Sequence, residues 1–422
     1  MATRFTHACA AAGVAVLLAC SPGRPALSGA AVSSPRSYLY LWTASADSTQ
    51  PDFLAVLDVT EDSARYGRLV TTLPVPGLGN TPHHVEHEMS PDRRLFANGF
   101  DSGRSFIFDL SDPVRPRLAG GFGDVEGYRH PHSYLRLPNG NVLATFQMRH
   151  TSGAMAPGGL VEVTPAGQVV RSASADAPGL DPATRVYSAG IVPALDRIVT
   201  TTTDMDANTP ASRQLQIWRL SDLALLHTIV LPDGARGGES HLTAEPRVLD
   251  DGRTVLVSTF DCGLYLMEGL EGDSPSGRLV ASFPMKPKTH CAIPVVAGHY
   301  YLVTVPAWSA VVSLDISDPA APREVSRVTL GADDVPHWIS MSPDRRRVVI
   351  TGYAAFRNRV AIARFDSATG RLAIDERFHE PGSTEPGYRM TGKTWPHGGS
   401  AAGIPHGAVF SRPARERGSL TR

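Results

Sequence analysis

Short stretches that alternate between apolar and polar residues recur along the whole chain, and turn-forming residues separate them. Segments such as Tyr38–Trp42 and Phe53–Val59 are long enough for one strand but too short for a typical helix, and an alternation of period two indicates strands. Glycine (39) and proline (34) together occupy about one position in six, which argues against long helices, coiled coils and helical repeats. The pattern predicts an all-β protein built from many short strands.

These strand-like stretches form a repeated unit. The segment His83–Phe122 is echoed by His337–Phe378, and both contain an inner strand, a Ser-Pro-Asp-Arg-Arg turn, an apolar strand, a polar loop, a second alternating strand and a closing strand. Looser copies of the unit start near four further positions: His132, Tyr187, His241 and His290. A unit of four short strands joined by turns is typical of a propeller blade.

Six units lie between residues 83 and 378, at spacings of roughly 47 to 55 residues that suit propeller repeats. A seventh unit combines both ends of the chain: strands at Tyr38–Trp42, Phe53–Val59 and Leu69–Leu73 with a fourth at Ile404–Arg412. Pairing the two ends closes the ring and removes the exposed edge strands of an open array. We therefore expect a single seven-bladed β-propeller over 36–412, with eight blades as the alternative and 413–422 as a disordered tail.

The composition suits a folded domain that binds neither nucleic acid nor a charged membrane surface. Hydrophobic residues make up 42% and charged residues 19%, so the chain is too apolar to be disordered and has ample material for a core. Lys and Arg (40) nearly balance Asp and Glu (41), for a net charge of −1. The chain therefore lacks the excess of positive charge that is typical of proteins that bind nucleic acid or anionic membranes. The expected partner is a small-molecule substrate, and we expect a monomer.

The first residues indicate export. Residues 1–19 have the pattern of a secretory signal peptide, with Arg4 before an apolar run, Ala10–Ala19, that is too short to span a bilayer. The end of the run, Leu-Leu-Ala-Cys20, resembles a bacterial lipobox, which implies lipidation of Cys20. Residues 20–35, rich in Pro, Gly and Ser, would then be a tether. We expect a periplasmic or cell-surface protein that touches the membrane only through this anchor, with secretion as the alternative.

Histidines recur where the inner strands begin. They are scarce, at 15 of 422 residues, and the innermost strand of each blade lines the centre of a propeller, so the residues at its leading end converge at one mouth. The candidate metal ligands are His83, His84, His132, His241, His290, His337 and one of His397 or His406. Only the unit that starts at Tyr187 lacks a histidine at this position. A ring of neutral imidazoles suits copper, and zinc is the second possibility.

Strand periodicity ranks some of these histidines. His83 and His84 are adjacent and should point apart on a regular strand, so both can bind a metal only if the backbone turns there; His84 is the first choice. His87 should point to the opposite face. His406 is preferred to His397, because "PHGAVF" alternates like an inner strand whereas "WPHGGSAAG" reads as a glycine-rich loop.

Three carboxylates lie beside these histidines in the sequence: Glu86, Glu126 and Glu239. Metal-binding imidazoles usually donate their second N–H to a carboxylate or carbonyl, so these residues are candidates for orienting the ligands. The alternative is that they are solvated loop acids.

Cys262 and Cys291 are the two thiols of the expected propeller, and each stands near the start of a strand in neighbouring units. An oxidising compartment permits a disulfide, which would place their Cα atoms roughly 4.4 to 6.8 Å apart. The alternative is that Cys291, next to His290, supplies a thiolate to copper.

One stretch resembles a known family. The run "PDFLAVLDVTEDSARYGRLVTTLPVPGLGNTPHHVEHEM", with "GYRHPHSYLRLPNGNVLATFQM" and "GGLVEVTPAGQVV" after it, resembles the selenium-binding protein family, which includes bacterial methanethiol oxidases. The pairs His83–His84 and His130–His132 match histidines of that family. The resemblance implies copper-dependent oxidation of a small thiol by oxygen. However, residues 35–130 contain no cysteine to hold selenium, and the later units contribute additional histidines.

Three functions follow from these observations. The first is an exported, copper-dependent oxidoreductase of the methanethiol oxidase type that acts on a small thiol. The second is a non-catalytic metal-binding or scaffold propeller lipoprotein, because a propeller fold does not define a function. The third is a metal-assisted, lactonase-like hydrolase, which would need Asp, Glu and Asn at the mouth where this sequence has His. Since no serine-nucleophile, phosphate-loop or dinucleotide motif is present, no organic cofactor is expected.

Overall fold

The computed structural model describes residues 36–413 except 152–153, 205–212, 288, 333 and 353–357. The predicted signal peptide (1–19), the tether with its lipidation site at Cys20, and residues 414–422 of the predicted tail lie outside the described residues. Within the described residues, no helix has the length and apolarity that crossing a membrane requires.

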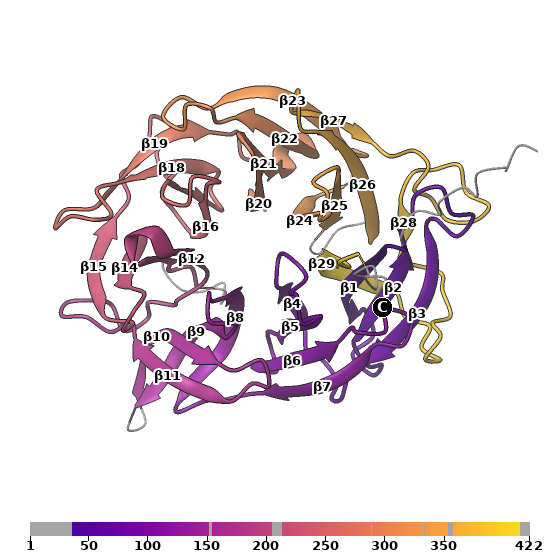
Figure 1. The fold of residues 1–422 in the computed structure, drawn as a ribbon, viewed down its shortest axis with the longest axis horizontal. Helices are drawn as coiled ribbons and strands as arrows, with labels where there is room; N and C mark the ends of the chain where they lie inside the picture. Colours follow the sequence, from indigo (N-terminus) through magenta and orange to yellow (C-terminus); the bar gives the residue numbers. More distant parts are fainter. Residues whose placement is uncertain are drawn as a thin grey trace, which may run out of the picture. The chain divides into compact units, whose positions relative to one another are not determined.

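The described residues fold into seven antiparallel sheets arranged as the blades of a propeller around a common axis (Figure 1). This confirms the predicted all-β, seven-bladed fold. Six sheets have four strands, and a short fifth strand joins the last one. Among the described residues are two 3-10 turns: η1 (Pro193–Leu195) connects the first two strands of its blade, and η2 (Pro306–Trp308) connects the second and third strands of its own.

The strands of each blade run from the axis outward in chain order, except that the C-terminal strand is innermost in the first blade and the short β28 of the last blade pairs with β26. That blade is β29 (Gly403–Phe410), β1 (Tyr38–Ser45), β2 (Phe53–Asp58) and β3 (Arg68–Pro74). The next three are β4 (Pro82–Val85), β5 (Arg94–Gly99), β6 (Arg104–Asp109) and β7 (Arg117–Phe122); β8 (Tyr128–Arg136), β9 (Val142–Thr151), β10 (Ala154–Val163) and β11 (Val169–Ser174); and β12 (Ala189–Val192), β13 (Arg197–Thr201), β14 (Gln214–Arg219) and β15 (Leu225–Val230). The last three are β16 (Thr243–Val248), β17 (Val255–Thr259), β18 (Gly263–Glu268) and β19 (Ser276–Ser282); β20 (Ala292–Ala297), β21 (Tyr300–Val305), β22 (Ala310–Asp315) and β23 (Arg323–Thr329); and β24 (Pro336–Met341), β25 (Arg347–Gly352), β26 (Arg359–Asp366), β27 (Arg371–Ile374) and β28 (Tyr388–Arg389).

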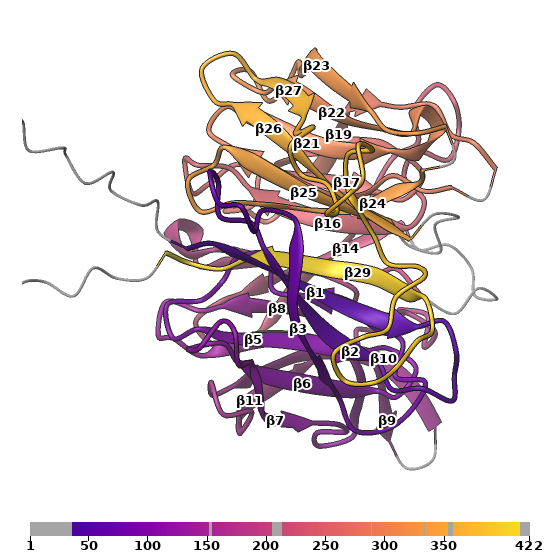
Figure 2. The ribbon, with the colours of Figure 1, turned by 90° about the vertical axis from the view of Figure 1, so that its right-hand side faces the viewer.

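The two ends of the propeller close the ring. β29 pairs antiparallel with β1, with Leu39 opposite Phe410 and Ser45 opposite Gly403, and Figure 2 shows the two strands side by side. The backbone N–H of Tyr38 also donates to the Ser411 hydroxyl at 2.9 Å. The predicted pairing of the C-terminal strand with the N-terminal segment is therefore confirmed, and the first blade depends on both ends of the chain.

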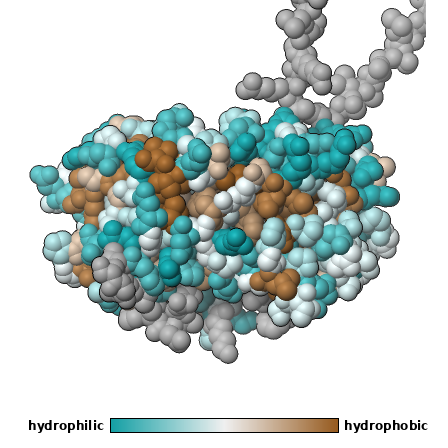
Figure 3. Space-filling view, turned by 90° about the horizontal axis from the view of Figure 1, so that it is seen from below, coloured by the Kyte–Doolittle hydropathy of each residue, from teal (hydrophilic) through white to brown (hydrophobic). Residues whose placement is uncertain are grey.

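Burial falls from the middle of each blade to its rim. β2 is buried at every position, whereas β7 and β23 are largely exposed. Apolar faces of neighbouring blades pack together, and the largest fully buried side chains include Trp42, Trp218 and Trp338. On the flank shown in Figure 3, hydrophilic residues surround separate hydrophobic patches, the mixed surface that is normal for a folded domain.

A disulfide links two neighbouring blades. Cys262, just before β18, is bonded to Cys291, just before β20, and their Cα atoms are 5.0 Å apart. This distance lies inside the predicted range. The disulfide state removes Cys291 as a thiolate ligand, so the alternative reading of this residue does not apply.

Candidate metal centre

The inner strands are interrupted near their starts by β-bulges. In β4, Pro82 and Val85 lie opposite Gly99 and Ala97 of β5, so β4 holds one residue more than its partner between these pairs. β8 and β29 carry bulges of the same kind, and β24 has a similar irregularity. A bulge bends its strand and re-aims the side chains within it.

The bulges hold the histidines that meet at the axis. The bulge of β4 contains His83 and His84, whose rings stack with centroids 4.5 Å apart. His132, His337 and His406 occupy the corresponding irregularities of β8, β24 and β29. His83 and His84 can face the same site only if the backbone turns between them, and the bulge of β4 provides that turn.

The approach to three inner strands is conformationally strained. Thr81, His130 and Leu242, which are not glycines, have φ values of 54°, 53° and 55°. Such conformations cost on the order of 1–3 kcal/mol each and often occur at functional sites. Two of these residues, Thr81 and His130, lie within two positions of the bulges of β4 and β8.

Five histidines form what we call the histidine cluster: His83, His84, His132, His337 and His406. Within the described part of the chain, one nitrogen from each of His83, His84 and His132 lies within 4.8 Å of the others, and the same holds for His83, His337 and His406. The two groups share His83. Three or more of the predicted ligands are thus close enough to share a metal ion.

Burial keeps the cluster uncharged. His83, His84, His132 and His406 are at most 1% exposed, and His337 is half-buried. Burial, with repulsion from neighbouring imidazoles, lowers the pKa of His83, His84 and His406 well below the usual value. The pKa of His132 and that of His337 are each lowered by burial to about 3. Neutral imidazole is the form that binds metals.

Hydrogen bonds select which nitrogens can act as ligands. His406 Nδ1 lies 2.7 Å from the backbone oxygen of His83; a carbonyl only accepts, so Nδ1 donates and Nε2 presents its lone pair. The Ser133 hydroxyl bridges Nδ1 of His132 (3.0 Å) and Nδ1 of His84 (3.3 Å). Nε2 of His132 is buried and has no hydrogen-bond partner among the described residues. An orphaned imidazole nitrogen inside such a cluster fits a metal ligand.

Glu245 is the carboxylate that the structure brings to the cluster. It is fully buried and lies in the bulge of β16, at the position that His84 occupies in β4. Its Oε1 is 4.0 Å from His84 Nδ1, and its Oε2 accepts hydrogen bonds from Ser188 Oγ and Arg247 Nη1, both at 2.7 Å. Our sequence reasoning missed Glu245 because it aligned this unit on His241 instead of on the residue before the bulge.

The three carboxylates predicted to orient the ligands have other partners. Glu86 pairs with Arg136, with Nε 2.6 Å from Oε1, and accepts the N–H of Phe96. Glu126 accepts a hydrogen bond from Ser172, and Glu239 accepts backbone N–H groups of its own loop. The structure therefore assigns these residues local structural contacts.

His241 and His290 lie at the rim instead of in the cluster. Their Nδ1 atoms are 3.6 and 3.7 Å from the two carboxylate oxygens of Asp261, and their side chains are 30% and 46% exposed. The predicted ring of ligands thus separates into a buried cluster and a rim group. A signal in the sequence distinguishes the two: the bulged His83, His132, His337 and His406 all follow proline, which strands tolerate at bulges, whereas His241 and His290 do not.

His397 and His87, the two other histidines that the strand pattern ranked, fall as it indicated. His397 lies near Thr72, with Nδ1 2.8 Å from its hydroxyl, so His406 is the residue of this pair that reaches the cluster. His87 faces away from the cluster and stacks on Trp338, with ring centroids 4.6 Å apart. Trp338 also contacts His84, at 5.0 Å, and so separates His87 from the cluster.

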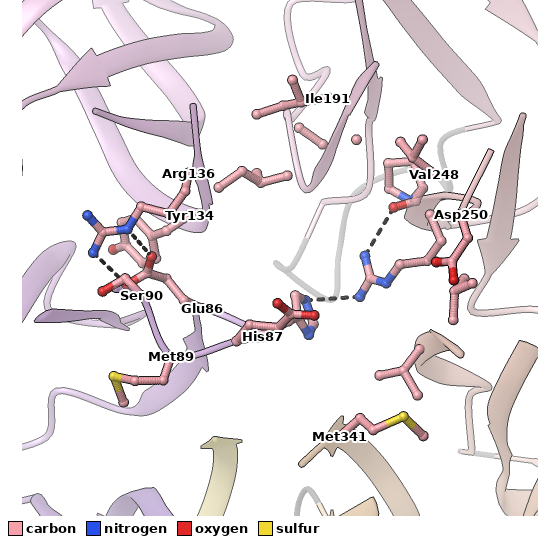
Figure 4. Close-up of a pocket in the computed structure, with 18 of the residues that line it drawn as sticks. Glu86, His87, Met89, Ser90, Tyr134, Arg136, Ile191, Val248, Asp250 and Met341 are labelled. Carbon is pink, nitrogen blue, oxygen red and sulfur yellow. Dashed lines mark hydrogen bonds and ion pairs between the residues drawn. The ribbon is translucent and has the colours of Figure 1, made fainter. Parts of the chain in front are cut away.

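A cavity of about 480 Å³ opens where the inner strands end. Figure 4 shows its lining, with Arg136 paired to Glu86 on one side, Val248 and Asp250 on the other, and His87 between them. Arg247 donates to His87 Nε2 at 2.9 Å. The layer formed by His87, Trp338 and Glu245 lies between this cavity and the cluster.

Fold and site together define a seven-bladed β-propeller that carries a buried cluster of neutral histidines at its axis. Among curated proteins, the chain is similar to a methanethiol oxidase of a Hyphomicrobium species, with 32% identity over 147 residues that make up 33% of each chain. The alignment therefore spans about a third of that relative. No protein-family model matches the chain.

Solved structures show the same architecture. A hypothetical selenium-binding protein from Sulfolobus tokodaii matches 89% of this chain and 94% of its own, with a TM-score of 0.72 and 16% identity. The periplasmic gluconolactonase of Pseudomonas aeruginosa matches 90% of this chain and all of its own, with a TM-score of 0.60 and 14% identity. At these identities the likeness shows the fold alone. The predicted resemblance to selenium-binding proteins and methanethiol oxidases is confirmed by the sequence alignment with the methanethiol oxidase, and the fold of the Sulfolobus protein agrees with it.

Proposed function

We propose that this protein is an exported oxidoreductase that holds copper on the histidine cluster and oxidises a small thiol. The observation that carries the proposal is the cluster itself: five buried or half-buried imidazoles from four blades, in two groups of three whose ligand nitrogens lie within 4.8 Å. Neutral imidazoles bind copper and zinc well. The methanethiol oxidase relative favours a redox reaction on a thiol, and zinc has no redox chemistry of its own.

The residues that would hold the ion are His84 and His132. His83 would join them, and it also belongs to the second group, with His337 and His406. Bound copper would supply one-electron redox chemistry and affinity for sulfur. The chain supplies rigidity, because bulges inside paired strands aim the rings. Phe100 lies beside His83 and Phe260 beside His337. The burial of the cluster limits the access of water to it.

Export belongs to the same proposal. We infer a lipoprotein anchored at Cys20 in the periplasm or at the cell surface, with residues 1–19 as its signal. The Cys262–Cys291 disulfide supports an oxidising compartment, because such bonds are rare in the cytosol. The gluconolactonase likeness does not favour a hydrolase, since a shared propeller fold hosts many unrelated functions.

The test is metal analysis of the full chain matured in the periplasm, together with oxygen-dependent consumption of methanethiol. The variant His84→Ala/His132→Ala should lose its copper and its activity while remaining folded, because neither side chain pairs strands. His397→Ala is the matched control, since His397 lies outside the cluster, and it should keep the wild-type copper content. A full copper complement in the double variant would refute the proposed site, and copper without thiol oxidation would leave a metal-binding propeller.

A further inference from the structure

One of the three blades without a cluster histidine contributes a tyrosine instead. Tyr187 precedes β12, and its backbone N–H donates to the Thr201 oxygen at 2.9 Å, which ties it to β13. The side chain is fully buried. Its ring lies 3.9 Å from the ring of His132 and 5.6 Å from that of His84, measured between centroids. Tyr187 is thus an integral part of the wall of the cluster.

The hydroxyl of Tyr187 points at a candidate ligand nitrogen. Its oxygen lies 3.2 Å from Nε2 of His84. Nδ1 of His84 faces Ser133 Oγ at 3.3 Å and Glu245 Oε1 at 4.0 Å, and a carboxylate only accepts hydrogen bonds. This surrounding favours a proton on Nδ1, which leaves the Nε2 lone pair directed toward the tyrosine oxygen.

The same two atoms have the spacing of neighbouring metal ligands. First-row metals bind imidazole nitrogen near 2.0–2.1 Å, so adjacent ligand atoms around one ion lie about 2.9 to 3.4 Å apart. The observed 3.2 Å falls within this range. A metal ion can therefore replace the hydrogen bond between Tyr187 and His84 without moving either side chain far.

Charge also favours an oxygen ligand here. The five imidazoles are neutral, and the nearby carboxylate of Glu245 is already paired with Arg247 at 2.7 Å. A divalent cation would bring two positive charges into a site with little access to water, which is costly unless an anion compensates for them. A phenolate at Tyr187 would supply one negative charge inside the cluster.

We propose that Tyr187 is a metal ligand, binding through its phenolate oxygen the ion that His84 and His132 hold. The inference rests on the proposed metal centre. On binding, the O–H bond of Tyr187 breaks, its proton passes to solvent, and a metal–oxygen bond forms with no change in oxidation state. The fourth blade then contributes an oxygen to the cluster, to which four other blades contribute nitrogens.

The experiment is titration of the metal-free full-length protein with Cu(II), followed by visible absorption and resonance Raman spectroscopy. Wild-type protein should develop a phenolate-to-copper charge-transfer band. Tyr187→Phe should lack that band and bind Cu(II) about 10- to 100-fold more weakly. Tyr301→Phe is the matched control, because Tyr301 is equally buried, lies in β21 outside the cluster, and its hydroxyl has no hydrogen-bond partner among the described residues.

Wild-type protein with ring-deuterated tyrosine gives a second measurement that does not depend on folding of the variant. The phenolate vibrations enhanced by the band should shift on deuteration. If wild type binds copper but shows no tyrosine-dependent band, and Tyr187→Phe binds it equally well, Tyr187 only hydrogen-bonds to His84 and this inference is overturned. If wild type binds no copper, the proposed metal centre itself is wrong, and the role of Tyr187 is refuted with it.

Discussion

Glu245 is a buried carboxylate that contacts both the histidine cluster and polar residues outside the cluster. It occupies in β16 the position that His84 occupies in β4, and it contacts His84, Ser188 and Arg247. Acids of this kind hold metal-binding imidazoles in place. At the residue scale, we therefore expect Glu245 to affect metal affinity as well as stability.

Replacing Glu245 with Gln should separate these two effects. The amide can still accept from Ser188, but Arg247 loses the charge that it pairs with, so the free energy of unfolding should fall by about 1–3 kcal/mol. Copper affinity should fall about 10- to 100-fold. Glu86→Gln is the control, because Glu86 is an equally buried partner of Arg136 outside the cluster. Equal copper affinities in the two variants, measured by competition with a chelator, would remove Glu245 from the metal site.

Single residues were predicted from the sequence less completely than the fold. The cluster histidines were among the candidates, because the repeat places them at the starts of inner strands. Glu245 and Tyr187 were not, since only histidines, with Cys291 as an alternative, were considered as ligands. The repeat places Tyr187 at the start of a unit, and it aligns the unit of Glu245 on His241. Whether a side chain faces the axis depends on backbone geometry at the bulge, which period-two alternation cannot describe.

The irregular pairing of the inner strands positions the side chains of the site. Six of the seven have an irregular register with their neighbour near the start, and β12 is the inner strand that pairs regularly. The strands themselves were predictable from alternation and turn residues. The proline before His83, His132, His337 and His406 was the visible sign of the irregularity, because proline cannot donate to the ladder and is confined in sheets to edges, strand starts and bulges.

The C-terminal strand should be required for both folding and the site. Removing residues 403–422 deletes β29, which leaves the inner edge of β1 unpaired and takes His406 from the cluster. An exposed edge promotes association, so this variant should aggregate and unfold at a lower temperature. Truncation after residue 413, which keeps β29 intact, should leave the melting temperature unchanged. Size-exclusion chromatography and thermal unfolding make the comparison, and a monomeric, stable 1–402 chain would contradict the closure described above.

At the scale of the whole molecule, the buried histidines should make the metal-free protein sensitive to acid. Burial lowers the pKa of the cluster histidines in the folded state, whereas in the unfolded chain they have ordinary values near 6.5. Below that pH the unfolded state binds more protons, so stability is lost as the pH falls from about 6.5 toward the depressed folded values, by up to about 1.4 kcal/mol per pH unit for each histidine.

Urea unfolding of the metal-free protein at pH 7.0 and at about pH 5.5 measures this loss, before most carboxylates titrate. The His84→Ala/His132→Ala variant should show a shallower dependence, because two of the contributing groups are gone. The His397→Ala variant should behave more like wild type, because His397 is only partly buried and this burial alone lowers its pKa. A free energy of unfolding that does not change between these pH values would contradict the account of a neutral, buried cluster.

The central claim is that the histidine cluster binds copper, and copper K-edge X-ray absorption on the full chain purified from the periplasm tests it most directly. We predict at least three imidazole ligands, seen as nitrogen neighbours at about 2.0 Å together with the outer-shell scattering of their rings. Because Cys291 is in a disulfide, no sulfur neighbour should appear unless substrate is present. A copper site without imidazole scattering, or one dominated by sulfur in the absence of substrate, would contradict the account.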